Sequence, residues 1–236
     1  MSSKKRTFSS VKLVITCEHG GYEIPSKYHN LFAGKKNILQ SHRGYDSGTE
    51  DLFEYCKDLA DFSKKNTMSR LLIEFNRSLH HKNVFSQFSQ NLNPEEKKEL
   101  INDYYLPYRS SVENFIKKEI SNGNPVFHLS LHSFTPQLSN EIRNNDIGLL
   151  YDSKRSEEKE LCQTFKSSLN SKNPELKIRY NYPYLGSADG FTTYLRKIFP
   201  SNYLGVELEI NQKLAKNNAF PIKLKNQLVQ VVKGLI

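Results

Sequence analysis

Two histidines in this sequence follow short apolar runs, and their placement suits metal binding or proton transfer. His19 comes just after the run 11–17, and His132 closes the run that begins at Val126. Imidazole nitrogens bind metals and exchange protons near neutral pH. Two histidines and a carboxylate make a three-ligand zinc site that leaves one position open for water. His19, His132 and Asp46 are the strongest candidates, although His132 could instead be a buried residue bonded to backbone.

Two glutamates in a later apolar run are candidates for a general base. Glu207 and Glu209 lie two positions apart in the run 203–210, so on a strand both side chains point to the same face. Carboxylates are costly to bury there unless they are paired or used. One of them could take a proton from a metal-activated water, whereas the other could pair with an arginine such as Arg143.

Arg77 follows Asn76 directly, and this pair suits recognition of a substrate carboxylate. A guanidinium group binds a carboxylate through two parallel hydrogen bonds. Arg70, in the run 69–75 just before the pair, could face a developing oxyanion. For either arginine the alternative is an ordinary surface ion pair.

Apolar runs typical of strands alternate along the chain with segments typical of helices. Strands are predicted at 11–17, 69–75, 126–131, 147–151, 178–182 and 203–210, and helices at about 47–65, 94–123, 156–169, 191–198 and from 222. Ser47 with Glu50 fits a capping box, and Asn93 followed by Pro94 marks a second helix start, with a break expected near Pro107. The alternation predicts an α/β protein with a layered sheet. If its strands are parallel, the polar groups at their ends should converge at one edge.

Length and composition limit the kind of protein. The 236 residues suffice for one sizeable core, and we expect a basic N-terminal tail at 1–10 followed by one catalytic domain at 11–236. Cys17, Cys56 and Cys162 form no CxxC pair, which argues against a disulfide framework and for a reducing compartment. The sequence shows no secretion signal and no apolar run near the ~20 residues of a membrane span. We therefore expect a cytoplasmic protein without a membrane partner.

The chain is basic, with a net charge of +9 and a pI of about 9.3. Together with thirteen tyrosines, which can stack on bases, this charge would suit a nucleic-acid-binding module. The lysines, however, are scattered along the predicted helices and form no basic arm. The charge would equally suit the binding of anionic metabolites or simple solubility, so the sequence gives nucleic acid little support as a partner.

Seven segments of the chain together resemble the N-formylglutamate amidohydrolase family. They are CEHGGYEIP (17–25), HRGYDSG (42–48), SRLLIEFNRS (69–78), LHSFTP (131–136), IRNNDIGLLYD (142–152), NYPYLGSADGFT (181–192) and GVELEINQ (205–212). They span nearly the whole chain in the family's order, which makes the set far more specific than any one motif. The resemblance implies an amidase that depends on zinc or another divalent metal. It also implies a single-domain, three-layer α/β/α sandwich with a mixed, mostly parallel sheet, the phosphorylase/hydrolase-like fold of zinc carboxypeptidases and aspartoacylases.

The resemblance also implies a metal site. The two histidines that follow the apolar runs would be ligands. In the related aspartoacylases, a glutamate three residues after the first histidine is another ligand, but Tyr22 occupies that position here. Asp46, or else Glu18 or Glu23, would then supply the carboxylate.

Further assignments concern the substrate and the proton. Asn76 and Arg77 resemble the Asn-Arg pair that holds the substrate's α-carboxylate in those relatives, and Tyr184 is expected to contact the substrate as well. Glu209 corresponds best to the general base at a strand end, with Glu207 as the alternative.

The resemblance predicts a hydrolase for the amide bond of a small anionic N-acyl amino acid, such as N-formyl-L-glutamate, with release of the free amino acid and a carboxylic acid. Arg70 or Arg143 would stabilise the tetrahedral oxyanion. The alternative within the same chemistry is a zinc carboxypeptidase-like enzyme or a cell-wall peptide amidase that acts on a larger substrate.

Overall fold

A computed structural model describes residues 11–236, so the predicted tail at 1–10 lies outside the described residues. At its centre is a six-stranded sheet in the order β2-β1-β3-β8-β6-β7. The strands are β1 (Lys12–Cys17), β2 (Phe62–Lys65), β3 (Val126–Phe134), β6 (Ile147–Leu150), β7 (Ile178–Tyr180) and β8 (Tyr203–Asn211). The first four strands in the spatial order are parallel, whereas β6 is antiparallel to β8 and parallel to β7. The predicted α/β fold with a mixed, mostly parallel sheet is confirmed.

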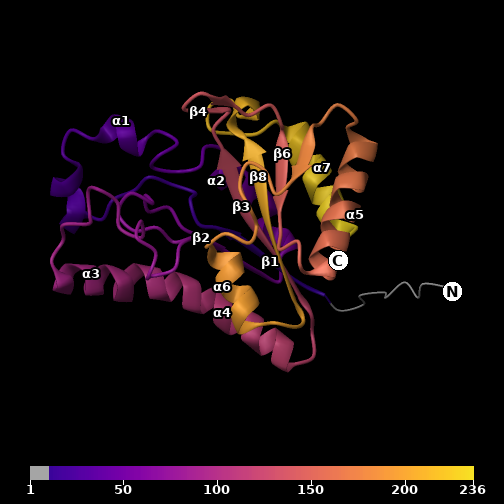
Figure 1. The fold of residues 1–236 in the computed structure, drawn as a ribbon, viewed down its shortest axis with the longest axis horizontal. Coiled ribbons are helices and arrows are strands. Elements are labelled where there is room, and N and C mark those ends of the chain that lie inside the picture. The colour runs from indigo at the N-terminus through magenta and orange to yellow at the C-terminus, as the bar shows by residue number, and fades with distance from the viewer. Residues whose placement is uncertain (1–10) are drawn as a thin grey trace.

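Helices cover both faces of the sheet and give three layers (Figure 1). One face carries α2 (Thr49–Cys56), α5 (Ser156–Lys172) and α7 (Ile222–Lys233), and the other carries α4 (Leu106–Ser121) and α6 (Phe191–Ile198). The short α1 (Lys36–Leu39) and α3 (Pro94–Leu100) lie to one side, at the left of Figure 1. No helix in 11–236 is long and apolar enough to cross a membrane.

The two faces of the sheet bury different kinds of side chain, because successive residues of a strand point to opposite faces. Toward α2, α5 and α7, strands β1, β3 and β8 present apolar side chains such as Ile15, Leu129 and Leu208. Toward α4 and α6, the same strands present buried polar side chains: Thr16, His128, Ser130, His132, Glu207 and Glu209. The sheet therefore has one apolar face and a second, polar face, on which these groups lie beside apolar residues such as Val14 and Val126.

The predicted helix over 47–65 is wrong in its second half. α2 ends at Cys56, and after the 3₁₀ turn Lys57–Leu59 the chain forms the edge strand β2 beside β1. Asp61 accounts for the break, because its backbone N–H and its carboxylate both pair with the backbone of Leu13. These bonds start the strand pairing where the helix would have continued.

The capping box predicted from Ser47 and Glu50 is absent. Gly48 precedes α2 with a φ of 86°, a left-handed conformation that glycine adopts without strain. The Ser47 hydroxyl instead donates to the side chain of Asn218 at 2.9 Å. The start of α2 is thereby tied to the loop that precedes α7.

The strand predicted at 69–75 is also wrong, because this run is a buried loop. The N–H of Leu72 donates to the Ser69 carbonyl and closes a turn, and the N–H of Glu74 donates to the carbonyl of Val84. The apolar side chains of the run pack in the core on the polar side of the sheet, with α4. An apolar run indicates that a segment is buried but does not establish that it is a strand, and here the buried segment pairs with no strand.

The helix predicted from residue 94 is present, with the capping box of Asn93 and Glu96 at its start. The predicted break is a π-helical turn, Ile101–Tyr105, just ahead of Pro107. Proline lacks an N–H and crowds the carbonyl four residues earlier, so a wider turn accommodates it. The other predicted elements are present with small shifts at their ends. One shift matters for the site, because β3 continues to Phe134.

The direction of β6 shapes the edge at which β3 and β8 end. Because β6 is antiparallel to β8, its first residue, Ile147, pairs with Ile210 near the end of β8. The segment 135–146 therefore stays at this edge, and it contains a small hairpin of β4 (Gln137–Leu138) and β5 (Glu141–Ile142).

Candidate active site

Three adjacent parallel strands bring the predicted histidines and the strand-end glutamates to one edge of the sheet. β1 leads into His19, β3 carries His132 near its end, and β8 carries Glu209, which pairs in register with His132. These strand ends meet as the parallel arrangement predicts. Asn76 and Arg77 arrive by a different route, in the loop that follows the run 69–75.

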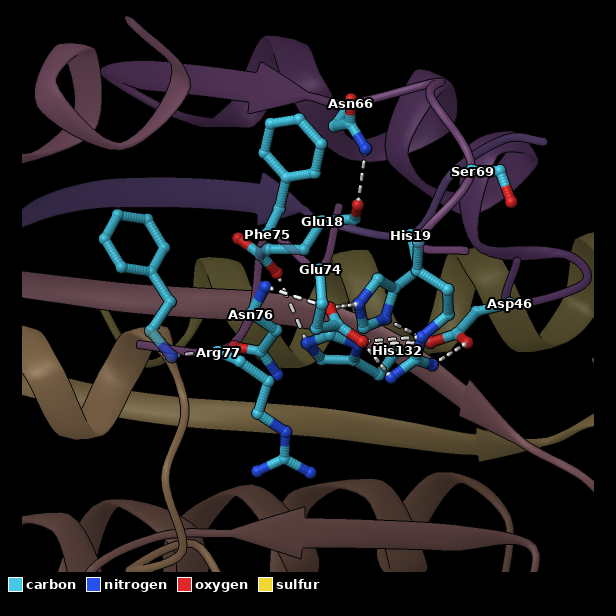
Figure 2. Close-up of polar contacts among 12 residues, drawn as sticks. Glu18, His19, Asp46, Asn66, Ser69, Glu74, Phe75, Asn76, Arg77 and His132 are labelled. Carbon is cyan, nitrogen blue, oxygen red and sulfur yellow. Dashed lines mark hydrogen bonds and ion pairs between the residues drawn. The ribbon is translucent and has the colours of Figure 1, made fainter. Parts of the chain in front are cut away.

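Asp46 lies between the two histidines and joins them into one buried cluster (Figure 2). Its Oδ2 atom is 3.2 Å from Nδ1 of His19 and 3.1 Å from Nδ1 of His132. The Asp46 backbone N–H donates to the His19 carbonyl at 2.9 Å, which holds the loop in place. One possible ligand atom from each residue lies within 4.8 Å of the others. The structure thus brings together all three residues predicted as metal ligands.

Two further glutamates hold the outer sides of the histidine rings. Nε2 of His19 contacts Oε1 of Glu74, and Nε2 of His132 is 3.2 Å from Oε2 of Glu18. Glu18 is fully buried and accepts the Tyr108 hydroxyl at 3.0 Å. A carboxylate on the outer nitrogen fixes the tautomer and orientation of a metal-binding histidine. Both rings therefore present Nδ1 to the centre of the cluster.

The other two carboxylates considered as ligands do not reach this centre. Glu18 lies behind His132, on the ring nitrogen that faces away from Asp46. Glu23 is exposed, and its carboxylate accepts the Thr67 hydroxyl at 2.6 Å. The geometry therefore favours Asp46 as the carboxylate ligand.

Charges within the cluster stabilise one another. Burial alone would raise the pKa of Asp46, but the two histidines and Arg70 hold it well below its usual range. Burial alone would lower the pKa of His132, but Asp46 and Glu18 raise it well above its ordinary value. Asp46 is therefore ionised, and a bound cation would replace the histidine protons as the positive charge that faces it.

The donor set fits a small divalent cation. Zinc accepts imidazole nitrogen and carboxylate oxygen at about 2.0–2.2 Å, and tetrahedral ligands at that distance lie roughly 3.3 Å apart. The two Nδ1–Oδ2 separations, 3.2 and 3.1 Å, are close to this value. Three protein ligands also leave a fourth position open, as in catalytic zinc sites.

Glu209 lies beside this cluster with a free carboxylate oxygen. Its Oε2 atom is buried and has no hydrogen-bond partner among residues 11–236. Burial raises the pKa of Glu209 to about 8, an effect that His132 opposes and that the carboxylates of Asp46 and Glu207 reinforce. Glu207 instead accepts the Thr192 hydroxyl at 2.6 Å. The geometry therefore favours Glu209 over Glu207 as the group that can take a proton.

A cavity of about 320 Å³ adjoins the cluster, and the predicted substrate-binding residues Asn76, Arg77 and Tyr184 line it. Oδ1 of Asn76 accepts the N–H of Phe191 at 2.7 Å, so the side-chain NH₂ group is the part left to donate to a ligand. Nη1 of Arg77 donates to the carbonyl of Asp189. The remaining donors of this guanidinium are available to an anion in the cavity.

The sequence between residues 11 and 215 matches the family model for N-formylglutamate amidohydrolase. The chain belongs to this family. The resemblance read from the seven segments is thereby confirmed, and family membership supports an amidohydrolase activity.

Solved structures show that the fold is shared. A gene product from Agrobacterium tumefaciens is similar with a TM-score of 0.77 and 21% identity, over 97% of this chain and 93% of that chain. The N-formylglutamate amidohydrolase from Ralstonia eutropha is similar with a TM-score of 0.71 and 17% identity, over 96% of this chain and 94% of that chain. A comparison with curated proteins gave no match.

Glu74 belongs to the site of this N-formylglutamate amidohydrolase family member, although it is not among the residues predicted from the sequence. It lies in the apolar run 69–75, four residues after Arg70 and two before Asn76. A charged residue is costly to bury unless it has a partner. An acid inside an apolar run, followed at once by a polar pair, was the signal that could have identified it.

The two arginines predicted to stabilise an oxyanion occupy different places. Arg70 lines the cavity, where Nε donates to Glu74 at 2.7 Å and Nη1 donates to Asp46 at 3.3 Å. Arg143 is buried, is absent from the cavity lining and donates to the Tyr184 hydroxyl at 3.2 Å. Of the two, Arg70 is the one placed to meet a substrate directly.

Proposed function

We propose that this protein is a metal-dependent hydrolase of the amide bond in a small anionic N-acyl amino acid such as N-formyl-L-glutamate. The products are the free amino acid and a carboxylic acid. One observation carries the proposal: the Nδ1 atoms of two histidines and a carboxylate oxygen converge beside Glu209, whose Oε2 atom has no partner. Family membership supports the same reaction class.

The proposed metal ligands are His19, Asp46 and His132. A divalent cation such as zinc, when bound there, would supply Lewis acidity toward the amide carbonyl and would lower the pKa of a coordinated water toward ~7. Glu74 and Glu18 keep the two imidazole rings turned so that their Nδ1 atoms face the ion.

Glu209 moves the proton in this mechanism. It removes a proton from the attacking water at its free Oε2 atom and then transfers that proton to the nitrogen of the leaving amine. A single carboxyl group can do both, as a base when ionised and as an acid once it has taken the proton. Arg70, which already neutralises Asp46 and Glu74, directs its charge toward the oxyanion that forms on the amide carbonyl.

Arg77 and Asn76 bind the substrate's carboxylate and so direct its amide toward Glu209 and the proposed ligands. The arginine supplies charge and planar donors, and the Asn76 NH₂ group supplies a neutral donor held in a fixed orientation by Phe191. Orientation of this kind contributes to rate by placing the reacting atoms in contact. Tyr184 borders the same cavity.

The three cysteines are buried free thiols. Thiols persist in a reducing compartment, and we propose that the enzyme acts in the cytoplasm.

The test combines metal analysis with an assay of N-formyl-L-glutamate, other N-acyl amino acids and short peptides. We expect about one divalent ion per chain, turnover that a chelator abolishes, and preference for substrates with a free carboxylate. A protein that binds no metal and hydrolyses none of these compounds would refute the proposal. Turnover of peptides alone would move the assignment to the peptidase alternative.

A further inference from the structure

Two residues outside the cavity hold the backbone of the segment that carries Asn76 and Arg77. Nη1 of Arg109 donates to the carbonyl of Phe75 at 3.0 Å and to the carbonyl of Arg77 at 3.3 Å. The hydroxyl of Tyr105 donates to the same Arg77 carbonyl at 2.6 Å. The carbonyls on both sides of Asn76 are therefore fixed from the helical layer.

Arg109 is a buried cation enclosed by aromatic rings. Its guanidinium carbon lies 4.2 Å from the ring centre of Phe191, 4.6 Å from that of Tyr194 and 5.0 Å from that of Tyr105. Only 4% of the residue is exposed. Cation–π contacts and carbonyl oxygens together compensate for the loss of water around such a group. The side chain is held rigidly, which suits a residue that fixes the position of others.

The same segment is tied on its other side to the loop before α6. The backbone N–H and the hydroxyl of Ser78 donate to the Asp189 carboxylate at 3.1 and 2.5 Å. Phe191 links the two sides, because its N–H fixes the amide of Asn76 and its ring packs on Arg109. The orientation of the Asn76 side chain thus depends on the residues that enclose Arg109.

Tyr105 reaches the segment from the last position of the π-helical turn Ile101–Tyr105. Such turns are rare and occur often beside functional sites. Arg109 follows four residues later on α4, so both side chains project from one face of the helix. The long helix thereby supports the cavity from behind without lining it.

We propose that Arg109 and Tyr105 are positioning residues for recognition of the substrate carboxylate. They set the backbone of 75–77 so that the amide of Asn76 and the guanidinium of Arg77 face the cavity together. The inference rests on the proposed function, in which this pair binds a carboxylate. Loss of either positioning residue weakens binding of a carboxylate while metal content stays unchanged.

A pair of matched variants tests this proposal. Tyr105→Phe and Tyr194→Phe each remove one hydroxyl from the rings around Arg109, but the Tyr194 hydroxyl donates to Glu113 at 2.8 Å and does not touch the segment. With the metal-loaded protein, calorimetry gives the Kd for L-glutamate and for its two mono-amides, and an assay gives kcat and KM for N-formyl-L-glutamate. We expect Tyr105→Phe to raise Kd and KM about three- to tenfold with kcat retained, since a hydrogen bond that supports binding is lost. Tyr194→Phe should match the wild type.

The amide ligands separate positioning from general destabilisation. The penalty of Tyr105→Phe should disappear for the mono-amide that lacks the carboxylate held by Arg77, whereas a loosened fold would weaken all three ligands equally. Arg109→Lys retains the charge but loses the planar donor group, and we expect a loss of roughly tenfold or more with the same dependence on the carboxylate.

Each outcome distinguishes the positioning role from the proposed function. If the wild type binds and hydrolyses its ligands but the two tyrosine variants behave alike, the positioning role is refuted and the function stands. If the wild type neither binds L-glutamate nor hydrolyses any N-acyl amino acid, the proposed function fails, and the positioning role fails with it.

Discussion

The two faces of the central sheet are built from the same strands but bury opposite kinds of side chain. Toward α2, α5 and α7, strand β3 presents Leu129 and Leu131, which are buried in the apolar core on that side. Toward α4 and α6, the alternate residues are Ser130 and His132; His132 lines the cavity, and the Ser130 hydroxyl contacts its ring. Strand alternation thus lets one short sequence contribute both to stability and to chemistry.

The polar face can be buried because nearly every group on it has a partner. His128 lies between the Thr16 hydroxyl at 2.7 Å and the Tyr203 hydroxyl at 2.8 Å, and the Ser130 hydroxyl donates to a carboxylate at 2.6 Å. Among the residues that the structure describes, Glu209 is the exception on these strands, with an unpartnered buried oxygen. A buried polar atom without a partner is costly, and on this face it stands where the proposed mechanism needs a base.

The largest effect should come from removing a metal ligand on the polar face. We expect His132→Ala to lose bound metal and to lower activity to background, because only two proposed ligands remain and the imidazole leaves a hole. Metal analysis and the amidase assay check this, with the exposed His29→Ala as the control. A variant that keeps both its metal and its activity would remove His132 from the ligand set.

A smaller loss should follow from changing the base alone. Glu209→Gln cannot accept a proton, so we expect kcat to fall about 10²–10⁴-fold with metal content near the wild type. Glu207→Gln should keep most activity, since its carboxylate is bonded to Thr192. If Glu207→Gln is the inactive variant and retains metal, the two roles are exchanged. If both variants stay active, the base lies elsewhere.

On the apolar face, a substitution next to the site should affect stability and spare the chemistry. Leu131 is 1% exposed and adjoins His132 but points to the opposite core. We expect Leu131→Ala to lower the free energy of unfolding by about 2–5 kcal/mol through lost burial and a cavity. Urea denaturation measures this change. The folded fraction should retain its metal and kcat, and loss of metal from folded protein would show that the faces are not independent.

The smallest effect concerns acid stability and His128. Burial lowers the pKa of His128 to about 4, so the unfolded chain binds a proton more readily between pH 6.5 and 4. Stability is therefore lost as the pH falls through this window, by roughly 2 kcal/mol at pH 5. In His128→Gln the slope of unfolding free energy against pH should flatten there, whatever the variant's overall stability. An unchanged slope would mean that His128 does not titrate in this way.

The sequence predicted most of the fold because burial and alternation leave clear patterns in β1, β3 and β8. It failed where local pattern and tertiary context disagree. The run 69–75 is apolar but pairs with no strand, and β2 is a short polar segment that becomes a strand only because β1 offers it an edge.

The residues of the site were also predictable where a local pattern marks them and not where tertiary context decides their role. His19 and His132 could be predicted because each is tied to a strand end, and Asp46 because a carboxylate was required. The sequence could not show that Glu74 and Glu18 hold the Nε2 atoms of the two histidines. Which nitrogen of a ring faces a neighbouring carboxylate depends on the orientation of that ring. That orientation is a property of the folded structure.

The reversed direction of β6 has a consequence for how enzymes of this family can diverge. Had β6 run parallel to β3 and β8, the chain leaving β3 would have had to cross back over the sheet, usually as a helix, whereas the segment 135–146 leads directly to a strand that starts at the same edge. Such a connection tolerates insertions and deletions, because its length fixes the position of no strand. Leu138 from this segment borders the cavity. The freedom to vary is confined to the exposed hairpin 137–142, because Arg143, Asn145 and Asp146 behind it are buried. Changes in the hairpin can therefore reshape the rim of the cavity while the proposed metal ligands and the core stay in place.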